Sequence, residues 1–162
     1  MFAPRLIALA ATVLDLARAS SLRIATAESC TGGLIAGLLT EVAGSSDVLE
    51  RGFVTYSNEA KAELLGIPMA VITENGAVSD VVARAMAEGA LQNSRAQIAV
   101  AVTGIAGPGG GTAEKPVGLV HMAAARVGAR TLHEEHRFGD IGRSLVRLRT
   151  AEAALRLVLR QL

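Results

Sequence analysis

Apolar and polar residues alternate along the first part of the chain with the periods of helices and strands in turn. Apolar positions recur at helical spacing over 3–19, which predicts a helix with one buried face. A short apolar run predicts a strand over 22–27, and a longer apolar stretch predicts a helix over about 31–42. Residues 51–56 then alternate like a half-buried strand.

The alternation of helices and strands continues to the end of the chain. It predicts helices over about 59–65, 80–91 and 143–162, and strands over 96–102, 117–127 and 130–138. The run over 96–102 has no polar face, which predicts a strand buried on both sides. We therefore expect an α/β fold with a single domain over 1–162, built as a three-layer α/β/α sandwich with a mixed, mostly parallel sheet.

The first apolar stretch has a second interpretation, as a secretory signal peptide. Residues 17–19 resemble a signal-peptidase site. The apolar run before them is short, ends at Asp15, and is preceded by only one basic residue, Arg5. The helical spacing therefore favours the first helix of the domain.

Composition excludes several classes of partner. The chain has 162 residues, of which 51% are hydrophobic and 2% aromatic, with a net charge of +1. Its basic residues are scattered, and it has too few aromatic side chains for nucleobases to stack on. We therefore expect no nucleic-acid partner. No run approaches the roughly 18 apolar residues of a membrane span, so we expect no membrane partner. The single cysteine, Cys30, cannot form an internal disulfide, which fits a cytoplasmic location.

Small hydroxyl residues and paired glycines stand where the first predicted strand leads into the next helix. Residues 27–33 are Ala-Glu-Ser-Cys-Thr-Gly-Gly. Backbone N–H groups at a helix N-terminus bind phosphates, carboxylates or developing oxyanions. The alternative is an ordinary turn capped by Ser29 or Thr31. Cys30 is a candidate nucleophile, because a helix N-terminus lowers a thiol pKa, but without a histidine candidate nearby a packing role is favoured.

A glycine-rich loop over 103–112 follows the most buried predicted strand and contains five glycines. Glycine lets a backbone approach a ligand closely. The loop matches neither a Walker nor a Rossmann motif, and a simple crossover loop is the alternative. If the strands over 22–27 and 96–102 are parallel neighbours, this loop and residues 27–33 meet at the carboxyl edge of the sheet, where open α/β sheets bind ligands.

Lysine is rare in this chain, which has 14 arginines and only two lysines, Lys61 and Lys115. Arginine does not deprotonate in proteins, whereas a desolvated lysine can act as a general base. A lysine retained against such a bias is therefore a candidate for acid–base chemistry. The alternative is that both lysines are surface residues without a role.

The histidines do not predict a metal site. On a strand, His133 and His136 are three positions apart and face opposite sides, so they cannot share an ion. His121 is expected to lie alone in another strand. We expect no metal, and among nucleophile–base combinations a Ser–Lys pair remains.

Several segments together resemble the CinA C-terminal domain family and cover nearly the whole chain. They are TAESCTGG at 26–33, GSSD at 44–47, YSNEAK at 56–61, TGIAGPGG at 103–110, KPVG at 115–118 and FGDIGR at 138–143. The resemblance implies a metal-free, cofactor-free nicotinamide-nucleotide amidase. Such an enzyme hydrolyses nicotinamide mononucleotide to nicotinate mononucleotide and ammonia, with a serine and a lysine at its centre. Larger relatives carry an additional N-terminal domain linked to pyrophosphatase activity.

The catalytic candidates are Ser29, Ser46, Lys61 and Tyr56, with Lys61 as the base and Tyr56 positioning Lys61 or the amide. Ser29 follows the first strand, at the edge expected for Lys61 and the glycine-rich loop, and is the favoured nucleophile. A second strand parallel to the first would place Ser46 at the opposite edge, whereas an antiparallel one would reverse this. The alternative function is a non-catalytic, nucleotide-binding regulatory module.

The expected partners are a pyridine nucleotide substrate and a second copy of the chain, in a homo-oligomer such as a dimer. The residues expected to bind the substrate are Glu28, Thr31, Gly32, Gly33, Asn58, Thr103, Gly104, Gly107, Gly109, Gly110 and Arg143. Many family members have Gly-Asp-Arg before the last helix, and here the register of the arginine is shifted. Arg143 and Arg147 are therefore both candidates to bind the substrate phosphate.

Overall fold

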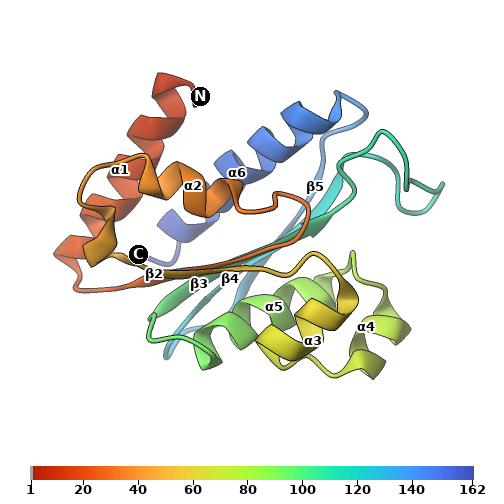
Figure 1. Cartoon of the computed structure of the whole chain (residues 1–162), viewed down its shortest axis with the longest axis horizontal. Coiled ribbons are helices and arrows are strands. Elements are labelled where there is room, and N and C mark those ends of the chain that lie inside the picture. Colours follow the sequence, from red (N-terminus) through yellow and green to blue (C-terminus); the bar gives the residue numbers. More distant parts are fainter. Residues whose placement is uncertain (1) are drawn as a thin grey trace.

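A mixed five-stranded sheet forms the centre of the computed structural model, which describes residues 2–162 (Figure 1). Its strands are β1 (Ile24–Glu28), β2 (Leu49–Val54), β3 (Ile98–Gly104), β4 (Leu119–Arg126) and β5 (Leu132–Arg137), in the order β2-β1-β3-β4-β5. β1 is parallel to β2 and β3, whereas β4 is antiparallel to β3 and β5. Only β4 therefore runs against the others, and the predicted mixed, mostly parallel sheet is confirmed.

Helices cover both faces of this sheet (Figure 1). One face carries α1 (Pro4–Ala19), α2 (Leu34–Thr40) and α6 (Arg143–Leu159), and the other carries α3 (Asn58–Leu65), α4 (Met69–Asn75) and α5 (Asp80–Gln92). A short 3-10 helix, η1 (Ser45–Asp47), precedes β2. The predicted three-layer α/β/α arrangement is confirmed. None of the helices within residues 2–162 is long and apolar enough to cross a membrane.

The central strand β3 shows how side chains divide between the two layers. Ile98, Val100 and Val102 pack in the core shared with α1, α2 and α6, whereas Ala99 and Ala101 pack in the core shared with α5. This division follows from the two-residue period of a strand. The branched residues fill one layer, and the small alanines allow α5 to approach the sheet closely.

Two helices differ from the sequence-based expectation. The helix expected from about residue 31 begins only at Leu34, because Gly32 and Gly33 have φ values of +60° and +98°, in the left-handed region that favours glycine. The sequence does not predict α4 at all. This helix has seven residues, of which the run over 71–73 is β-branched and has low helix propensity.

Candidate active site

The candidate site is a cavity of about 230 Å³ at the carboxyl ends of β1 and β3. Its lining residues with polar or reactive side chains are Ser29, Cys30, Tyr56, Asn58, Lys61, Thr103 and Arg143. They come from the segment after β1, from the entry and body of α3, from β3 and from the first turn of α6. Because β1 and β3 are parallel neighbours, the segment after β1 and the glycine-rich loop meet at this edge, as the sequence predicts.

Ser29 and Lys61 lie in contact at the centre of the cavity. Lys61 Nζ is 3.1 Å from Ser29 Oγ. Ser29 directly follows β1, and α3 carries Lys61 one turn after its N-cap Ser57, whose side chain accepts a hydrogen bond from the N–H of Ala60. The two side chains are largely shielded from water, since Ser29 is 9% exposed and Lys61 only 1%.

The surroundings of Lys61 favour a neutral amine. Burial lowers the pKa of Lys61 from its ordinary value of 10.5. None of the ion pairs among residues 2–162 includes this lysine. A lowered pKa makes the neutral amine, the form that a general base needs, easier to reach.

The hydrogen bonds of Lys61 also orient the N–H groups and the lone pair of the neutral amine. Nζ lies 3.0 Å from the carbonyl oxygen of Thr55 and 3.5 Å from that of Ser57. A neutral amine has two N–H groups and one lone pair, and a carbonyl oxygen only accepts hydrogen bonds. With both N–H groups donated to the carbonyls, the lone pair of Lys61 faces the Ser29 hydroxyl, as proton abstraction requires.

Ser46 lies at the other end of the sheet. It is exposed in η1, just before β2, and β2 is parallel to β1. The strand that follows Ser46 therefore begins at the edge of the sheet opposite to the one where Ser29 follows β1. The structure brings Ser29, and not Ser46, to Lys61.

Cys30 lines the cavity beside Ser29, but it is only 6% exposed and packs against the apolar core. Burial raises the pKa of its thiol to about 12, which outweighs the lowering expected from a nearby helix N-terminus. The thiol therefore stays protonated at neutral pH, consistent with a packing role.

Glu28 caps α2, which differs from its expected place in substrate binding. Its carboxylate accepts hydrogen bonds from the backbone N–H groups of Gly33, Ile35 and Ala36 at 3.1, 3.0 and 2.9 Å. Glu28 is 1% exposed, so the chain itself supplies the anion that the helix N-terminus attracts. A substrate anion cannot bind there, which also removes Gly33 from the expected set.

Two further residues of the turn after β1 do not reach the cavity. Thr31 is fully buried, and Gly32 donates its N–H to the carbonyl oxygen of Ser29 at 3.0 Å. Neither residue lines the cavity. These expectations fail because the turn packs under α6, where the guanidinium of Arg147 binds its carbonyls.

The glycine-rich loop contributes only its first part to the cavity. Thr103 and Gly104 line it, and Thr103 Oγ1 donates to the carbonyl oxygen of Ala77 at 2.8 Å. Gly107 does not line the cavity, and its carbonyl oxygen accepts a hydrogen bond from Arg143. Gly109 and Gly110 are exposed and lie outside the cavity. Gly107, Gly109 and Gly110 are therefore not among the residues that line the cavity, contrary to their expected contacts with substrate.

Arg143 and Tyr56 meet at the mouth of the cavity. Arg143 donates to Tyr56 Oη and to the carbonyl oxygen of Gly107, each at 2.9 Å. Arg147, the other candidate for the phosphate, does not line the cavity. Asn58 completes the rim at the start of α3.

Lys115 has a structural place outside the cavity. Its Nζ donates to the carbonyl oxygens of Val78 and Asn75 at 2.8 and 3.3 Å, and so ties the segment after β3 to the end of α4. Residues 77 and 78 form a wall of the cavity. The sequence does not predict this wall, because alanine and valine carry no chemical signal.

His121 is not alone, contrary to the expectation. His121 lies opposite Glu135 and His133 opposite Ala123, so the two histidines are diagonal neighbours on one face of the β4–β5 pair. Their ring nitrogens Nδ1 and Nε2 are 3.0 Å apart. Over residues 2–162 no group of three or more His, Cys, Asp and Glu side chains is arranged to hold a metal ion.

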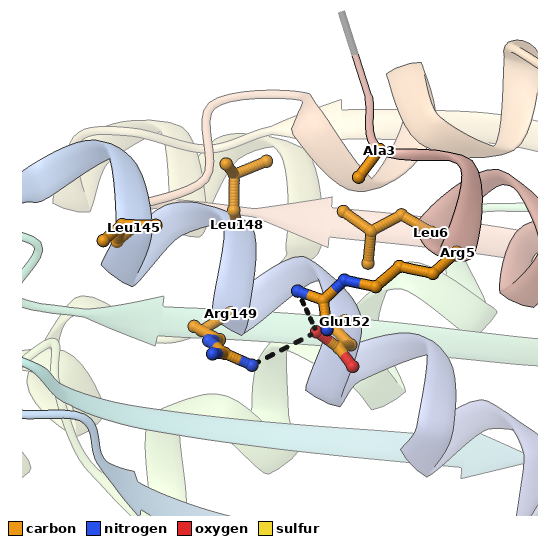
Figure 2. A pocket seen from close by; sticks show the side chains of 7 residues that line it. All are labelled: Ala3, Arg5, Leu6, Leu145, Leu148, Arg149 and Glu152. Carbon is orange, nitrogen blue, oxygen red and sulfur yellow. Dashed lines mark ion pairs between the residues drawn. The ribbon is translucent and has the colours of Figure 1, made fainter.

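A second, smaller hollow of about 110 Å³ lies between α1 and α6 (Figure 2). Arg5 and Arg149 converge there on the carboxylate of Glu152, at 3.5 and 3.7 Å. Apolar side chains such as Leu6 and Leu148 form the remainder of its walls. It contains no nucleophile–base pair, whereas the cavity at the sheet edge holds Ser29 beside Lys61.

Comparisons with known proteins agree on one family. The model of the CinA C-terminal domain matches residues 6–162. A putative competence-damage inducible protein of Caldicellulosiruptor bescii is 50% identical over 146 residues, which are 90% of this chain and 35% of that protein. A CinA-like protein of Akkermansia muciniphila is 60% identical over 113 residues, 70% of this chain and 27% of that protein. The chain therefore spans about a third of the length of these curated relatives.

Solved structures resemble the whole chain. The competence/damage inducible protein CihA of Agrobacterium tumefaciens has a TM-score of 0.97 at 54% identity, covering 99% of this chain and 97% of its own. A CinA superfamily protein of Escherichia coli has a TM-score of 0.91 at 30% identity, covering 100% and 94%.

Proposed function

We propose that this chain, which belongs to the CinA C-terminal domain family, hydrolyses nicotinamide mononucleotide to nicotinate mononucleotide and ammonia. One observation carries the proposal. A buried lysine that forms no ion pair within residues 2–162 lies 3.1 Å from the hydroxyl of Ser29, inside a cavity at the carboxyl edge of the sheet, where open α/β sheets bind ligands. Serine paired with a neutral lysine is a known arrangement for acyl transfer.

The proposed reaction begins with proton transfer between these two residues. Lys61 Nζ takes the proton of Ser29 Oγ as the oxygen attacks the carboxamide carbon. The carbonyl oxygen becomes an oxyanion, and the protonated amine then gives its proton to the leaving nitrogen, which departs as ammonia. Water then attacks the acyl carbon of the ester on Ser29 as Lys61 Nζ takes one of its protons. The bond from the acyl carbon to Ser29 Oγ breaks, Lys61 returns the proton to Oγ, and nicotinate mononucleotide is released.

The charge of the cavity supports an anionic substrate. Arg143 and Lys61 line it, and no carboxylate is among its lining residues within the part of the chain that the structure describes. With Lys61 neutral, Arg143 supplies the positive charge at the mouth, and we assign the substrate phosphate to it, with Tyr56 orienting its guanidinium. Asn58 at the rim carries an amide that can pair with the substrate carboxamide.

The deciding experiment measures ammonia released from nicotinamide mononucleotide, nicotinamide riboside and free nicotinamide by the purified chain. Without the phosphate, kcat/KM is expected to fall at least ~10-fold, because a hydrogen bond to a charged group contributes about 1.5–3 kcal/mol. Arg143→Met should remove most of this preference. Tight binding of the mononucleotide without ammonia release would instead favour a non-catalytic regulatory module.

Replacing Cys30 with alanine should leave most of the activity, because the thiol is protonated and packed in the core. Turnover in this variant should also become independent of treatment with a thiol-alkylating reagent. The measurement is ammonia release before and after alkylation, with unfolding followed by circular dichroism. A folded but inactive Cys30→Ala protein would make the cysteine, and not Ser29, the candidate nucleophile.

Removal of divalent metal ions should not reduce activity. No metal-binding cluster exists among residues 2–162, and the proposed proton transfers need only Lys61. The measurement compares ammonia release before and after dialysis against a chelator, with a zinc peptidase treated in parallel as a positive control. Activity that is lost and then restored by one divalent ion would contradict the Ser–Lys mechanism.

A further inference from the structure

Glu28, the last residue of β1, is a buried carboxylate that is held by backbone groups alone. It is 1% exposed, and its two oxygens accept hydrogen bonds from the N–H groups of Gly33, Ile35 and Ala36. No lysine or arginine within residues 2–162 forms an ion pair with it. Because burying a charge without a counter-ion is costly, these three hydrogen bonds are what keep the carboxylate in place.

The peptide group between Glu28 and Ser29 is also held on both sides. Its carbonyl oxygen accepts a hydrogen bond from the N–H of Thr55 at 2.9 Å, and its N–H donates to the carbonyl oxygen of Val102 at 3.1 Å. The carbonyl oxygen of Thr55 in turn accepts a hydrogen bond from Lys61 Nζ at 3.0 Å. Glu28 is therefore connected to the proposed nucleophile along the chain, and to the proposed base through a single residue.

The turn that follows Ser29 has little stiffness of its own. Its last two residues before α2 are Gly32 and Gly33, whose φ values are +60° and +98°. Glycine adopts many backbone conformations at little cost, so this pair does not by itself fix the path of the turn. The Glu28 carboxylate binds the N–H of Gly33, at the far end of the turn, at 3.1 Å. One side chain therefore ties the end of the turn back to the residue that precedes it.

We propose that Glu28 is a positioning residue, which closes the turn over 29–33 and so holds Ser29 Oγ at the Lys61 amine. The inference rests on the proposed function, because the 3.1 Å between these two atoms matters for the reaction only if Lys61 takes the proton of Ser29. Proton transfer requires hydrogen-bond distance, and a misplacement of about 1 Å can lower a rate about 10²-fold. Glu28 does not line the cavity, so it acts through Ser29.

Both oxygens of the carboxylate take part in closing the turn. Oε2 accepts hydrogen bonds from Gly33 and Ile35, and Oε1 accepts one from Ala36. A glutamine side chain has nearly the same size, but only one of its two terminal atoms accepts hydrogen bonds. In Glu28→Gln the amide nitrogen therefore faces at least one backbone N–H, which loosens the turn without leaving a cavity.

The test compares Glu28→Gln with Glu50→Gln, the same change at another glutamate that accepts a backbone N–H. Glu50 binds the N–H of Arg95 at 3.2 Å and lies near the start of β2, at the edge of the sheet opposite to the cavity. Two rates are measured. One is ammonia release from nicotinamide mononucleotide, and the other is labelling by an alkyl fluorophosphonate, in which Ser29 Oγ displaces fluoride from phosphorus. The labelling needs no nucleotide and is followed by mass spectrometry.

Glu28→Gln should lower kcat and the labelling rate about 10- to 100-fold, with KM little changed. Glu50→Gln should match the unmodified protein in both reactions. All assays are run below the unfolding transition of each variant, as measured by circular dichroism. Under these conditions a merely structural role of Glu28 predicts a lower unfolding temperature with normal rates, and that result would overturn the inference. A rise in KM at unchanged kcat would also overturn it, by assigning Glu28 to substrate binding.

Glu28→Asp carries the test should Glu28→Gln fail to fold. Its carboxylate is one methylene shorter and cannot meet all three N–H groups at once, so both rates should still fall at least ~10-fold, and normal rates would contradict the proposal. If the unmodified protein is labelled on Ser29 but releases no ammonia, the proposed substrate is wrong, and the labelling rates still decide the role of Glu28. An unreactive Ser29 in the unmodified protein would overturn the Ser–Lys mechanism and this inference together.

Discussion

Replacing Lys61 with arginine is expected to lower turnover of nicotinamide mononucleotide at least ~10³-fold, the scale of losing one member of a catalytic pair. Arginine keeps the positive charge and the hydrogen-bond donors but does not deprotonate at accessible pH. It therefore cannot take the proton of Ser29 Oγ. The measurement is single-turnover ammonia release, with the fold checked by circular dichroism.

The second lysine provides the matched control. Lys115 only donates hydrogen bonds to carbonyl oxygens, and arginine can do the same, so Lys115→Arg should retain turnover. Because Lys61 is 1% exposed, accommodating the larger guanidinium costs about 1–3 kcal/mol of packing energy. Lys61→Met removes the amine at a similar side-chain volume, so it tests the loss of the base without this packing cost. Near-normal turnover in either folded variant would exclude Lys61 as the base.

The pH dependence of the unmodified protein follows from the same group. The base must be neutral, so kcat/KM should rise with pH as Lys61 loses its proton, and level off above the pKa of this lysine. Since burial lowers that pKa, the rise should lie below the ordinary lysine value of 10.5. In Lys61→Met the residual rate should not show this limb. A profile that rises only above pH 10.5 would mean that Lys61 is not desolvated in the working enzyme.

Much of the fold could be predicted from local patterns. The run over 98–102 has no polar face, and it forms the central strand between two helical layers. Ser57 and Ser79 start helices as N-caps, where their side chains accept hydrogen bonds from backbone N–H groups. These features depend on neighbours within a few residues of the sequence. The seven-residue helix α4 lacks such a signal and is not predicted.

The site itself depends on contacts between distant segments. The parallel pairing of β1 with β2 decides that Ser29, and not Ser46, lies near Lys61, and a sequence pattern alone does not determine strand direction. Likewise, the sequence of residues 27–33 does not show whether the backbone N–H groups at the start of α2 are free to bind a ligand or already bonded within the chain. The carboxylate of Glu28 accepts three hydrogen bonds from these N–H groups, and the spacing of residues in the sequence does not reveal them.

Substitution of Ser29 by alanine is expected to reduce turnover to background, at least ~10³-fold, and to prevent trapping of an acyl-enzyme. The oxygen removed is the one that faces the Lys61 amine at 3.1 Å, and among residues 2–162 no other serine lines the cavity. The fold should tolerate the change, because it removes a single atom. Rapid quenching with mass spectrometry should detect an adduct on the unmodified protein and none on Ser29→Ala.

Ser46→Ala is the matched control for this loss, since it makes the same change at an exposed serine near the opposite edge of the sheet. It should turn over at close to the normal rate and should still form the adduct on Ser29. The reverse result, with a folded Ser46→Ala protein inactive and Ser29→Ala active, would require Ser46 to reach Lys61. Because β1 and β2 are parallel, that would demand a rearrangement of the segment before β2 and not a change of side-chain rotamer. A dead Ser29→Ala beside an active Ser46→Ala would leave the buried Ser29–Lys61 pair as the reacting centre.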